Sequence, residues 1–248
     1  ARALGIRPIV SLRGGAGARH AAERAGCTVL PSDADPLALA NVLVVDDPSP
    51  AEARAWAHRA RRTGVLCVGV QDAGAADCEA DLVVDGGVCA QPTRSLRRLV
   101  GSRYCLLDTR RALSSRGSGR SGRRVLIALG GGGHVRRLAR RLASAVADRC
   151  PSAEIVVASG FVASPLPRLR RGRWIASPTG LAAQLRTSSV VVVAGGQTLY
   201  EACSLGVPAV SVAVVRAQRR AIAACSSAGA ILDAGGPEMN EATATRVA

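Results

Sequence analysis

The residues best suited to chemistry stand in one short stretch, where two glycines precede a threonine and a glutamate. Gly195 and Gly196 follow a Val-rich run, and Gln197, Thr198 and Glu201 complete the segment Gly-Gly-Gln-Thr-x-x-Glu. Glycines leave room for a ligand, and the N–H groups at the start of a helix bind phosphate. A carboxylate such as that of Glu201 is a strong acceptor for the hydroxyls of a ribose. The segment therefore predicts a nucleotide site.

A purely structural interpretation of the same residues stays open. The spacing of Thr198 and Glu201 is that of a capping box, in which the hydroxyl caps a helix and the carboxylate returns a hydrogen bond. In that case Thr198 would cap a short helix, and Glu201 would only close its start.

A second glycine-rich loop lies earlier in the chain, between an apolar run and a helical stretch. Gly130, Gly131, Gly132 and Gly133 are followed by His134, a candidate ligand contact. Backbone N–H groups in such a loop can approach a phosphate at the N-terminus of a helix. The spacing is neither Gly-x-Gly-x-x-Gly nor a P-loop, so a tight turn without a ligand is the alternative.

The charge of the chain is concentrated in its middle third. The 248 residues carry a net charge of +15, every basic residue except histidine is Arg, and residues 94–173 hold 19 Arg against three acids. These arginines form either a solvated face or a positively charged surface that attracts phosphate or an anionic membrane. Aromatic residues are only 2%, which disfavours nucleic acid because single strands are bound by aromatic stacking.

Composition limits the class of protein further. With 48% hydrophobic residues the chain can bury a large core, which excludes wholesale disorder. No apolar run approaches the length of a membrane span. The 8 cysteines are scattered without a Cys-x-x-Cys pair, which favours a reduced, cytoplasmic protein without a metal site. Asp46 and Asp47 precede Pro48, where ordinary turn chemistry explains them better than metal binding.

Short Val- and Ile-rich runs alternate with stretches of helical period, which is typical of parallel α/β sheets. The predicted strands are residues 8–12, 28–30, 42–46, 65–70, 82–85, 124–129, 154–158, 173–175, 190–194, 209–214 and 230–232. The predicted helices are residues 16–25, 50–63, 134–148, 179–187, 198–205 and 217–228. A Gly/Ser/Arg-rich segment at 112–123 has the composition of a linker. We therefore expect two doubly wound α/β domains, at 1–111 and 124–248.

Several segments together resemble a known family. Residues 43–46, 99–107, 125–132 and 195–201 are similar, in order and separation, to the UDP-sugar hydrolase of pseudaminic acid synthesis and its spore-coat polysaccharide relatives. The segment from Gly195 to Pro208 also resembles the nucleotide-sugar signature of glycosyltransferases with two Rossmann-like domains, the GT-B fold. The peptidoglycan N-acetylglucosaminyltransferase is one of these.

The resemblance implies hydrolysis of a UDP-linked amino sugar, without a required metal or cofactor, in bacterial surface-glycan synthesis. It implies substrate contacts from Gly130, Gly131, Gly132, Gly195, Gly196, Gln197, Thr198, Glu201 and Gln218. The family carries its proposed catalytic base in a Gly-His loop between a first strand and helix, which has no counterpart here, so the base is unassigned. The alternatives are a UDP-sugar glycosyltransferase and a catalytically silent nucleotide-sugar-binding module.

Overall fold

The computed structural model describes residues 5–13, 15–47, 49–71, 79–90, 97–107, 122–161, 165–176 and 180–236. The chain divides into two compact units, residues 1–14 with 22–106 and residues 15–21 with 107–248. Residues 112–121 of the predicted linker lie outside the described residues. The predicted domain limits therefore stay a prediction.

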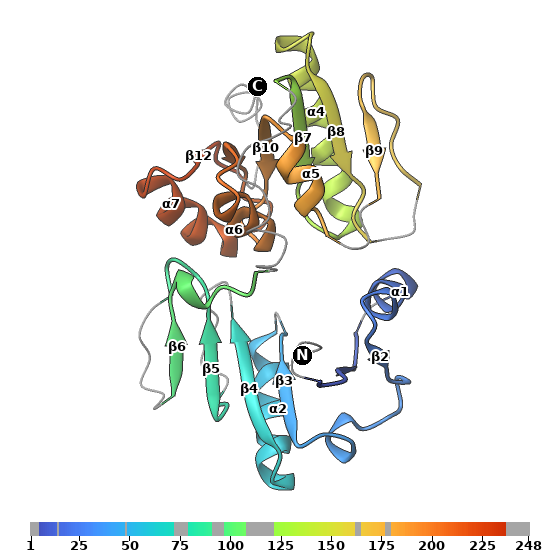
Figure 1. The fold of residues 1–248 in the computed structure, drawn as a ribbon, viewed down its shortest axis with the longest axis vertical. Coiled ribbons are helices and arrows are strands. Elements are labelled where there is room, and N and C mark those ends of the chain that lie inside the picture. Colours follow the sequence, from blue (N-terminus) through green and yellow to red (C-terminus); the bar gives the residue numbers. More distant parts are fainter. Residues whose placement is uncertain are drawn as a thin grey trace. The chain divides into compact units, whose positions relative to one another are not determined.

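The second unit is built on one sheet of six parallel strands (Figure 1), as the alternating pattern predicted. Across the sheet the order is β12-β11-β10-β7-β8-β9. The strands are β7 (Arg124–Ala128), β8 (Glu154–Ala158), β9 (Arg173–Ile175), β10 (Val190–Val193), β11 (Ala209–Ser211) and β12 (Leu232–Asp233). The first strand in sequence lies in the middle, so the chain builds outward in one direction and then in the other.

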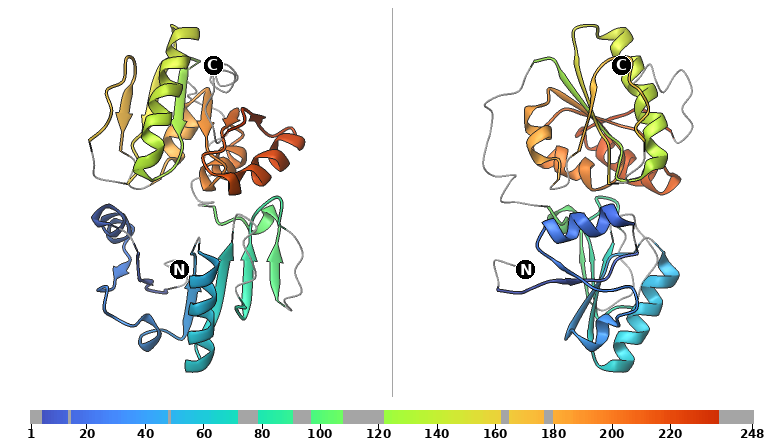
Figure 2. Two further views of the ribbon diagram at one scale, coloured as in Figure 1. Left: turned by 180° about the vertical axis from the view of Figure 1, so that it is seen from behind. Right: turned by 90° about the vertical axis from the view of Figure 1, so that its right-hand side faces the viewer.

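Helices lie on both faces of this sheet (Figure 2). They are η4 (Gly133–Val135), α4 (Arg136–Arg149), α5 (Ala182–Thr187), α6 (Gln197–Ser204), η5 (Arg216–Gln218) and α7 (Arg219–Ser227). Apolar residues of α4 recur at helical spacing, and Ala139, Leu142 and Val146 are buried against Ile127 and Ile155 of the sheet. Burial of this stripe is what holds α4 on the sheet.

The first unit contains two parallel sheets, β1-β2 and β3-β4-β5-β6. Their strands are β1 (Ile9–Val10), β2 (Thr28–Val29), β3 (Val42–Val45), β4 (Leu66–Gln71), β5 (Leu82–Asp85) and β6 (Arg98–Val100). The helices are η2 (Pro36–Ala38), α2 (Pro50–Thr63) and η3 (Ser102–Tyr104). Helix α1 (Ala16–Arg24), between β1 and β2 in the chain, is divided between the two units, because residues 15–21 belong to the second. Strand β6 was not predicted, because its three residues begin with an arginine and carry no strand-length apolar run.

Helix α2 has the predicted limits because both ends carry strong signals. Ser49 is the N-cap and its Oγ accepts the Glu52 N–H at 3.5 Å, while Gly64 ends the helix in a left-handed conformation with φ of 73°. Ala53, Ala57 and Ala60 face the sheet and are buried. Small residues on this face let the helix lie close to the strands.

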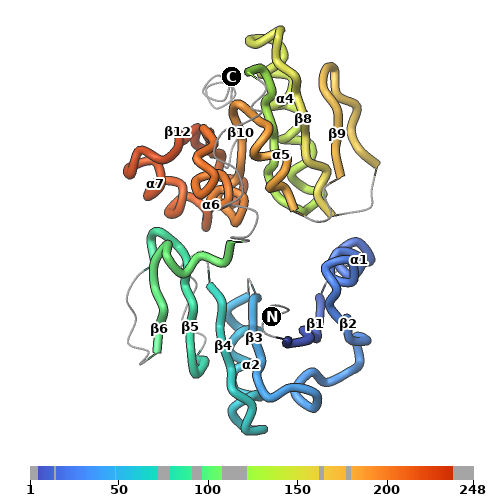
Figure 3. The backbone as a smooth tube through the Cα atoms, in the orientation of Figure 1, coloured from blue at the N-terminus to red at the C-terminus, as the bar shows by residue number. Residues whose placement is uncertain are grey.

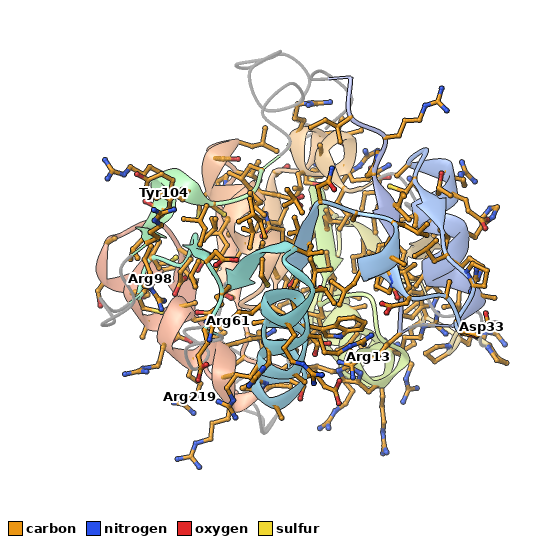
Figure 4. The ribbon with its side chains drawn as sticks, turned by 90° about the horizontal axis from the view of Figure 1, so that it is seen from below. Arg13, Asp33, Arg61, Arg98, Tyr104 and Arg219 are labelled. Carbon is orange, nitrogen blue, oxygen red and sulfur yellow. The ribbon has the colours of Figure 1, made fainter. Side chains whose placement is uncertain are left out.

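A buried ionic cluster lies at the carboxyl end of β4 and β5. Arg98, labelled in Figure 4, lies 3.7 Å from Asp85 and donates to Gln71 at 3.4 Å. Asp85 in turn accepts the N–H of Gly87 at 3.0 Å. All three side chains of the cluster are buried, and a buried charge of this kind requires its partner.

No helix in the described ranges is long and apolar enough to cross a membrane. Over the same residues there is no group of three or more His, Cys, Asp or Glu side chains that could hold a metal ion.

Candidate functional site

The two glycine loops meet at the point where the order of the second sheet reverses. Strands β7 and β10 are neighbours, with Ala128 opposite Val193 in the register. Gly130 and Gly195 each stand two residues beyond this pair. In open parallel sheets, ligands bind at the carboxyl ends of the strands at this reversal. The topology therefore brings together the two loops that the sequence singled out.

Gly195 is packed so tightly that its missing side chain is required by the fold. A Cβ at this position would lie 2.8 Å from Cβ of Gln218, 2.8 Å from Cγ1 of Ile222 and 3.0 Å from the Gln218 carbonyl oxygen. These contacts seat η5 and α7 against the turn after β10. Because Gly195 has no side chain, η5 and α7 can pack directly against the turn, and this packing places Gln218 beside it.

The side chain of Gln218 has a fixed orientation. Its Oε1 accepts the N–H of Val214 at 3.0 Å, so its amide nitrogen is the end that remains for other partners. That nitrogen lies 4.0 Å from where a Cβ of Gly196 would be. Gln218 therefore presents a hydrogen-bond donor to the turn. Its predicted contact with a substrate stays a prediction.

Helix α6 begins at Gln197, one residue earlier than predicted, and this changes the interpretation of Thr198. The N-cap is Gly196, and no side chain caps the helix. Thr198 as an N-cap and Glu201 as part of a capping box are therefore both wrong. Gln197, Thr198 and Glu201 are half-buried, and the last two, three residues apart, share one face of the helix.

The first glycine loop differs from a simple phosphate loop because protein side chains cover part of it. A Cβ on Gly131 would lie 2.6 Å from the ring of Phe161, and one on Gly132 would lie 2.6 Å from the ring of His134. The Gly131 carbonyl also accepts the N–H of Phe161 at 3.0 Å. Gly130 has a φ of 123° and no atom within 4 Å of its Cβ position, so it has the space that Gly131 and Gly132 lack.

The sequence analysis missed two residues that shape this loop. Phe161, the only Phe in the chain, is 49% exposed beside Gly131. Arg136, the first residue of α4, is buried and donates through Nε and one terminal nitrogen to the Ser159 carbonyl, at 3.1 and 2.9 Å. This bond ties the start of α4 to the end of β8. An aromatic residue shortly after a strand is the one sequence signal for Phe161, and nothing in the sequence distinguishes the buried Arg136 from the exposed arginines of α4.

Among the residues that the structure describes, two groups have displaced pKa values, and neither belongs to a glycine loop. On α6, a hydrogen bond from Cys225 lowers the pKa of the Cys203 thiol to about 7. At the amino end of β8, a hydrogen bond from Arg124 is the main cause that lowers the pKa of Glu154 below its ordinary value. Arg124 binds this carboxylate at 2.9 and 3.1 Å, and Arg173 adds a contact at 3.3 Å. Neither group identifies a catalytic base.

Part of the Arg-rich middle third is an exposed surface. Arg137, Arg140 and Arg141 of α4 are exposed, and Arg170 pairs with Asp148 near the end of the same helix at 3.1 Å. On α7, Arg219 (Figure 4) donates to the Gly236 carbonyl at 2.8 Å. The predicted contact with an anionic membrane surface stays a prediction.

Comparison with known proteins gives structural neighbours only. No family model and no curated protein matches the chain. The hydrolase family that the sequence resembles therefore has no support beyond the fold.

Three solved structures illustrate the likeness. The glycotransferase of kitacinnamycin matches with a TM-score of 0.58 and 15% identity over 99% of this chain and 87% of its own. The spinosyn rhamnosyltransferase complexed with thymidine diphosphate matches with a TM-score of 0.53 and 19% identity, over 84% of this chain and 62% of its own. A putative UDP-N-acetylglucosamine 2-epimerase from Listeria monocytogenes matches with a TM-score of 0.56 and 10% identity, over 92% and 75%.

The chain spans less than two thirds of the length of the spinosyn enzyme. At these identities the likeness establishes the fold alone. This protein has an α/β fold with parallel sheets that is similar to the GT-B glycosyltransferase structures, as the sequence predicted.

Proposed function

We propose that the second unit binds a nucleoside diphosphate sugar at the reversal of its sheet, and that the protein is a glycosyltransferase using this donor. The observation that carries the proposal is the matched position of Gly130 and Gly195, each two residues beyond the Ala128–Val193 pair. The diphosphate would lie over these turns, where backbone N–H groups and the start of α6 favour an anion.

The side chains nearby suit the rest of such a ligand. Glu201, half-buried on α6, would accept hydrogen bonds from the ribose hydroxyls. The amide nitrogen of Gln218, oriented by the Val214 N–H, would donate to a phosphate or sugar oxygen. Thr198, on the same face of α6 as Glu201, would contact the diphosphate.

Transfer is preferred to hydrolysis because named glycosyltransferases stand among the structural neighbours. One neighbour is complexed with thymidine diphosphate, and another is described as a UDP-N-acetylglucosamine 2-epimerase. Both thymidine and uridine nucleotides are therefore to be tested. The hydrolase reaction predicted from the sequence differs from glycosyl transfer in one respect, because water takes the place of the acceptor hydroxyl. A silent binding module would bind the nucleotide and release nothing.

The reaction test follows nucleoside diphosphate release from UDP- and TDP-sugars, with and without an acceptor bearing a free hydroxyl. We expect release that depends on the acceptor. Release at the same rate in water alone would establish the hydrolase instead, and tight binding without release would establish the silent module.

The site itself is tested by calorimetric titration with UDP and TDP. Removing a hydrogen-bonding partner from a buried ligand costs about 1–3 kcal/mol, so Glu201→Gln and Gln218→Ala should each weaken binding by that amount. Asp148→Asn is the matched control, because Asp148 also carries one negative charge but lies in the last turn of α4, at the opposite end of that helix from the loop. Equal affinity in all three variants would remove Glu201 and Gln218 from the site.

A further inference from the structure

Two cysteines of the second unit lie in contact, although they belong to different helices. Cys203 is in the last turn of α6, and Cys225 is in α7. The Cys225 thiol donates a hydrogen bond to the sulfur of Cys203, so the two sulfur atoms are neighbours. Figure 3 shows the two helices side by side in this unit. The fold therefore brings together two thiols that the sequence leaves scattered.

The two thiols differ in their exposure. Cys225 is 4% exposed and belongs to the buried face of α7, together with Ala221 and Ile222. Cys203 is half-buried, so solvent reaches part of it. A buried cysteine usually acts as a small apolar side chain, and this role accounts for Cys225. It does not account for Cys203, which is partly open to solvent and bonded to a second thiol.

The contact between the thiols also makes Cys203 reactive. The hydrogen bond from Cys225 favours the thiolate and lowers the pKa of Cys203 to about 7. A large share of Cys203 is therefore ionised at neutral pH, and the thiolate is the nucleophilic form of a cysteine. In redox-sensitive proteins a partly exposed thiolate stands beside a second thiol, which reacts with its first oxidation product. Cys203 has the properties of the attacking thiol, and Cys225 those of the second.

The same face of α7 contacts the glycine turn that precedes α6. A Cβ on Gly195 would lie 2.8 Å from Cγ1 of Ile222 and 2.8 Å from Cβ of Gln218. Ile222 and Cys225 are three residues apart, so they share one face of α7. This face thus meets the α6 segment at two places, at the turn before the helix and at Cys203 near its end. A movement of α7 at one place is therefore transmitted to the other.

We propose that Cys203 and Cys225 form a reversible disulfide between α6 and α7 when the protein meets a peroxide, and that this bond weakens nucleotide binding. The Cys203 thiolate attacks one peroxide oxygen and becomes a sulfenic acid, and the other oxygen leaves as hydroxide. The Cys225 thiol then attacks the sulfenic sulfur, and its proton leaves with the sulfenic oxygen as water. The two sulfurs lose two electrons, which reduce the peroxide to two waters. A small dithiol restores both thiols by thiol–disulfide exchange.

The effect on binding follows from the packing at Gly195. Disulfide formation draws the two sulfurs from hydrogen-bonding contact into covalent contact, so α6 and α7 must move relative to each other. The space beside Gly195 is already filled by Gln218 and Ile222, so this movement displaces Gln218. This part of the inference rests on the proposed function, in which the Gln218 amide donates to the ligand. Disulfide formation itself does not.

The first part of the test identifies the disulfide in the 248-residue chain. The protein is treated with hydrogen peroxide, its remaining thiols are alkylated, and it is digested with trypsin without reduction. Arg216 and Arg220 separate the two cysteines, so mass spectrometry should find the two tryptic peptides joined, and dithiothreitol should part them.

Two variants accompany this measurement. In Cys225→Ala, oxidation of Cys203 should stop at the sulfenic acid, which dimedone traps. Cys27→Ala is the matched control, because Cys27 is also half-buried but belongs to the first unit, and it should leave the joined peptides unchanged. Recovery of Cys203 unlinked, or linked to other cysteines as often as to Cys225, would overturn the inference.

The second part compares UDP binding by the reduced, oxidised and re-reduced chain in calorimetric titrations. We expect oxidation to lower UDP affinity about tenfold, as the loss of one hydrogen bond to the ligand would, and dithiothreitol to restore it. Cys203→Ser cannot form the bond, so its UDP affinity should not respond to peroxide. Equal affinity of the reduced and the fully linked chain would refute the effect on binding. Absence of UDP binding by the reduced chain would refute the proposed function and this effect with it, while the joined peptides decide on the disulfide.

Discussion

Replacing Gly195 by alanine is the sharpest test of how the proposed site is built. The new methyl group would lie 2.8 Å from Cβ of Gln218 and from Cγ1 of Ile222, about 1 Å closer than ordinary carbon contacts. The obstructing Gln218 atom is next to the backbone, so η5 and α7 must move. Overpacking of this kind costs about 1–3 kcal/mol, partly offset by about 0.4–1 kcal/mol from the stiffer unfolded chain.

With central values of about 2 kcal/mol for the cost and about 0.7 kcal/mol for the offset, the net expectation is a loss of about 1.3 kcal/mol of stability in the second unit, which lowers its Tm by about 3–5 °C. The chain has 2 Trp residues, Trp56 on α2 of the first unit and Trp174 on β9 of the second. In a Trp56→Phe background, Trp174 fluorescence therefore follows the second unit alone. Because Gln218 is displaced, UDP affinity should also fall about tenfold or more, equivalent to about 1.4 kcal/mol.

Gly122→Ala is the matched control for this measurement. Gly122 has open space at its Cβ position and no left-handed φ, so its alanine variant carries the unfolded-state gain without the clash. If Gly195→Ala unfolds at the same temperature as Gly122→Ala and binds UDP as tightly as the unchanged chain, the contact between Gly195 and Gln218 does not support the site.

Three further outcomes follow from the same structure. Arg124 holds the pKa of Glu154 below its ordinary value. The pair therefore stabilises the second unit fully above the unfolded carboxyl pKa of about 4.3, and this stabilisation is lost as pH falls through the lower pKa of the folded state. Arg124→Gln should therefore make the free energy of unfolding depend less on pH in acid. Cys203 alkylation, followed by peptide mass spectrometry, should rise with a midpoint near the pKa of about 7, and Cys225→Ala should move that midpoint upward. Leu126→Ala, at a fully buried position in β7, should cost about 2–5 kcal/mol in denaturant unfolding.

The sequence predicted the parallel strands of the second unit well because each is a short, nearly continuous apolar run. Residues 190–194 and 124–129 could only be buried strands, and glycines after them marked both ends. What it could not predict was the packing of those glycines. Gly131 and Gly132 have the same sequence signal as Gly130, yet the rings of Phe161 and His134 fill their places. The contact of Gly131 with Phe161 joins residues far apart in the sequence, and the contact of Gly132 with His134 depends on the rotamer of the histidine. Neither can be predicted from the sequence.

Gly196 is the position where packing and ligand binding make different demands. Its backbone is extended, with φ of −106° and ψ of −158°, a conformation that any residue adopts. The nearest atom to its Cβ position is 4.0 Å away, so neither strain nor crowding requires glycine there. The best residues for a helix N-cap are Ser, Asp and Asn, whose side chains bond the first N–H groups of the helix.

A glycine at this N-cap therefore gives up a side-chain cap without a gain in packing. The arrangement has a physical reason if a ligand oxygen takes the place of that side chain at the start of α6, as the proposed diphosphate would. Gly196→Ser separates the two demands, because the serine hydroxyl would cap α6 and occupy the same N–H groups. Thermal unfolding should show equal or higher stability, while titration with UDP should show weaker binding. Equal or tighter UDP binding by the serine variant would place the anion elsewhere.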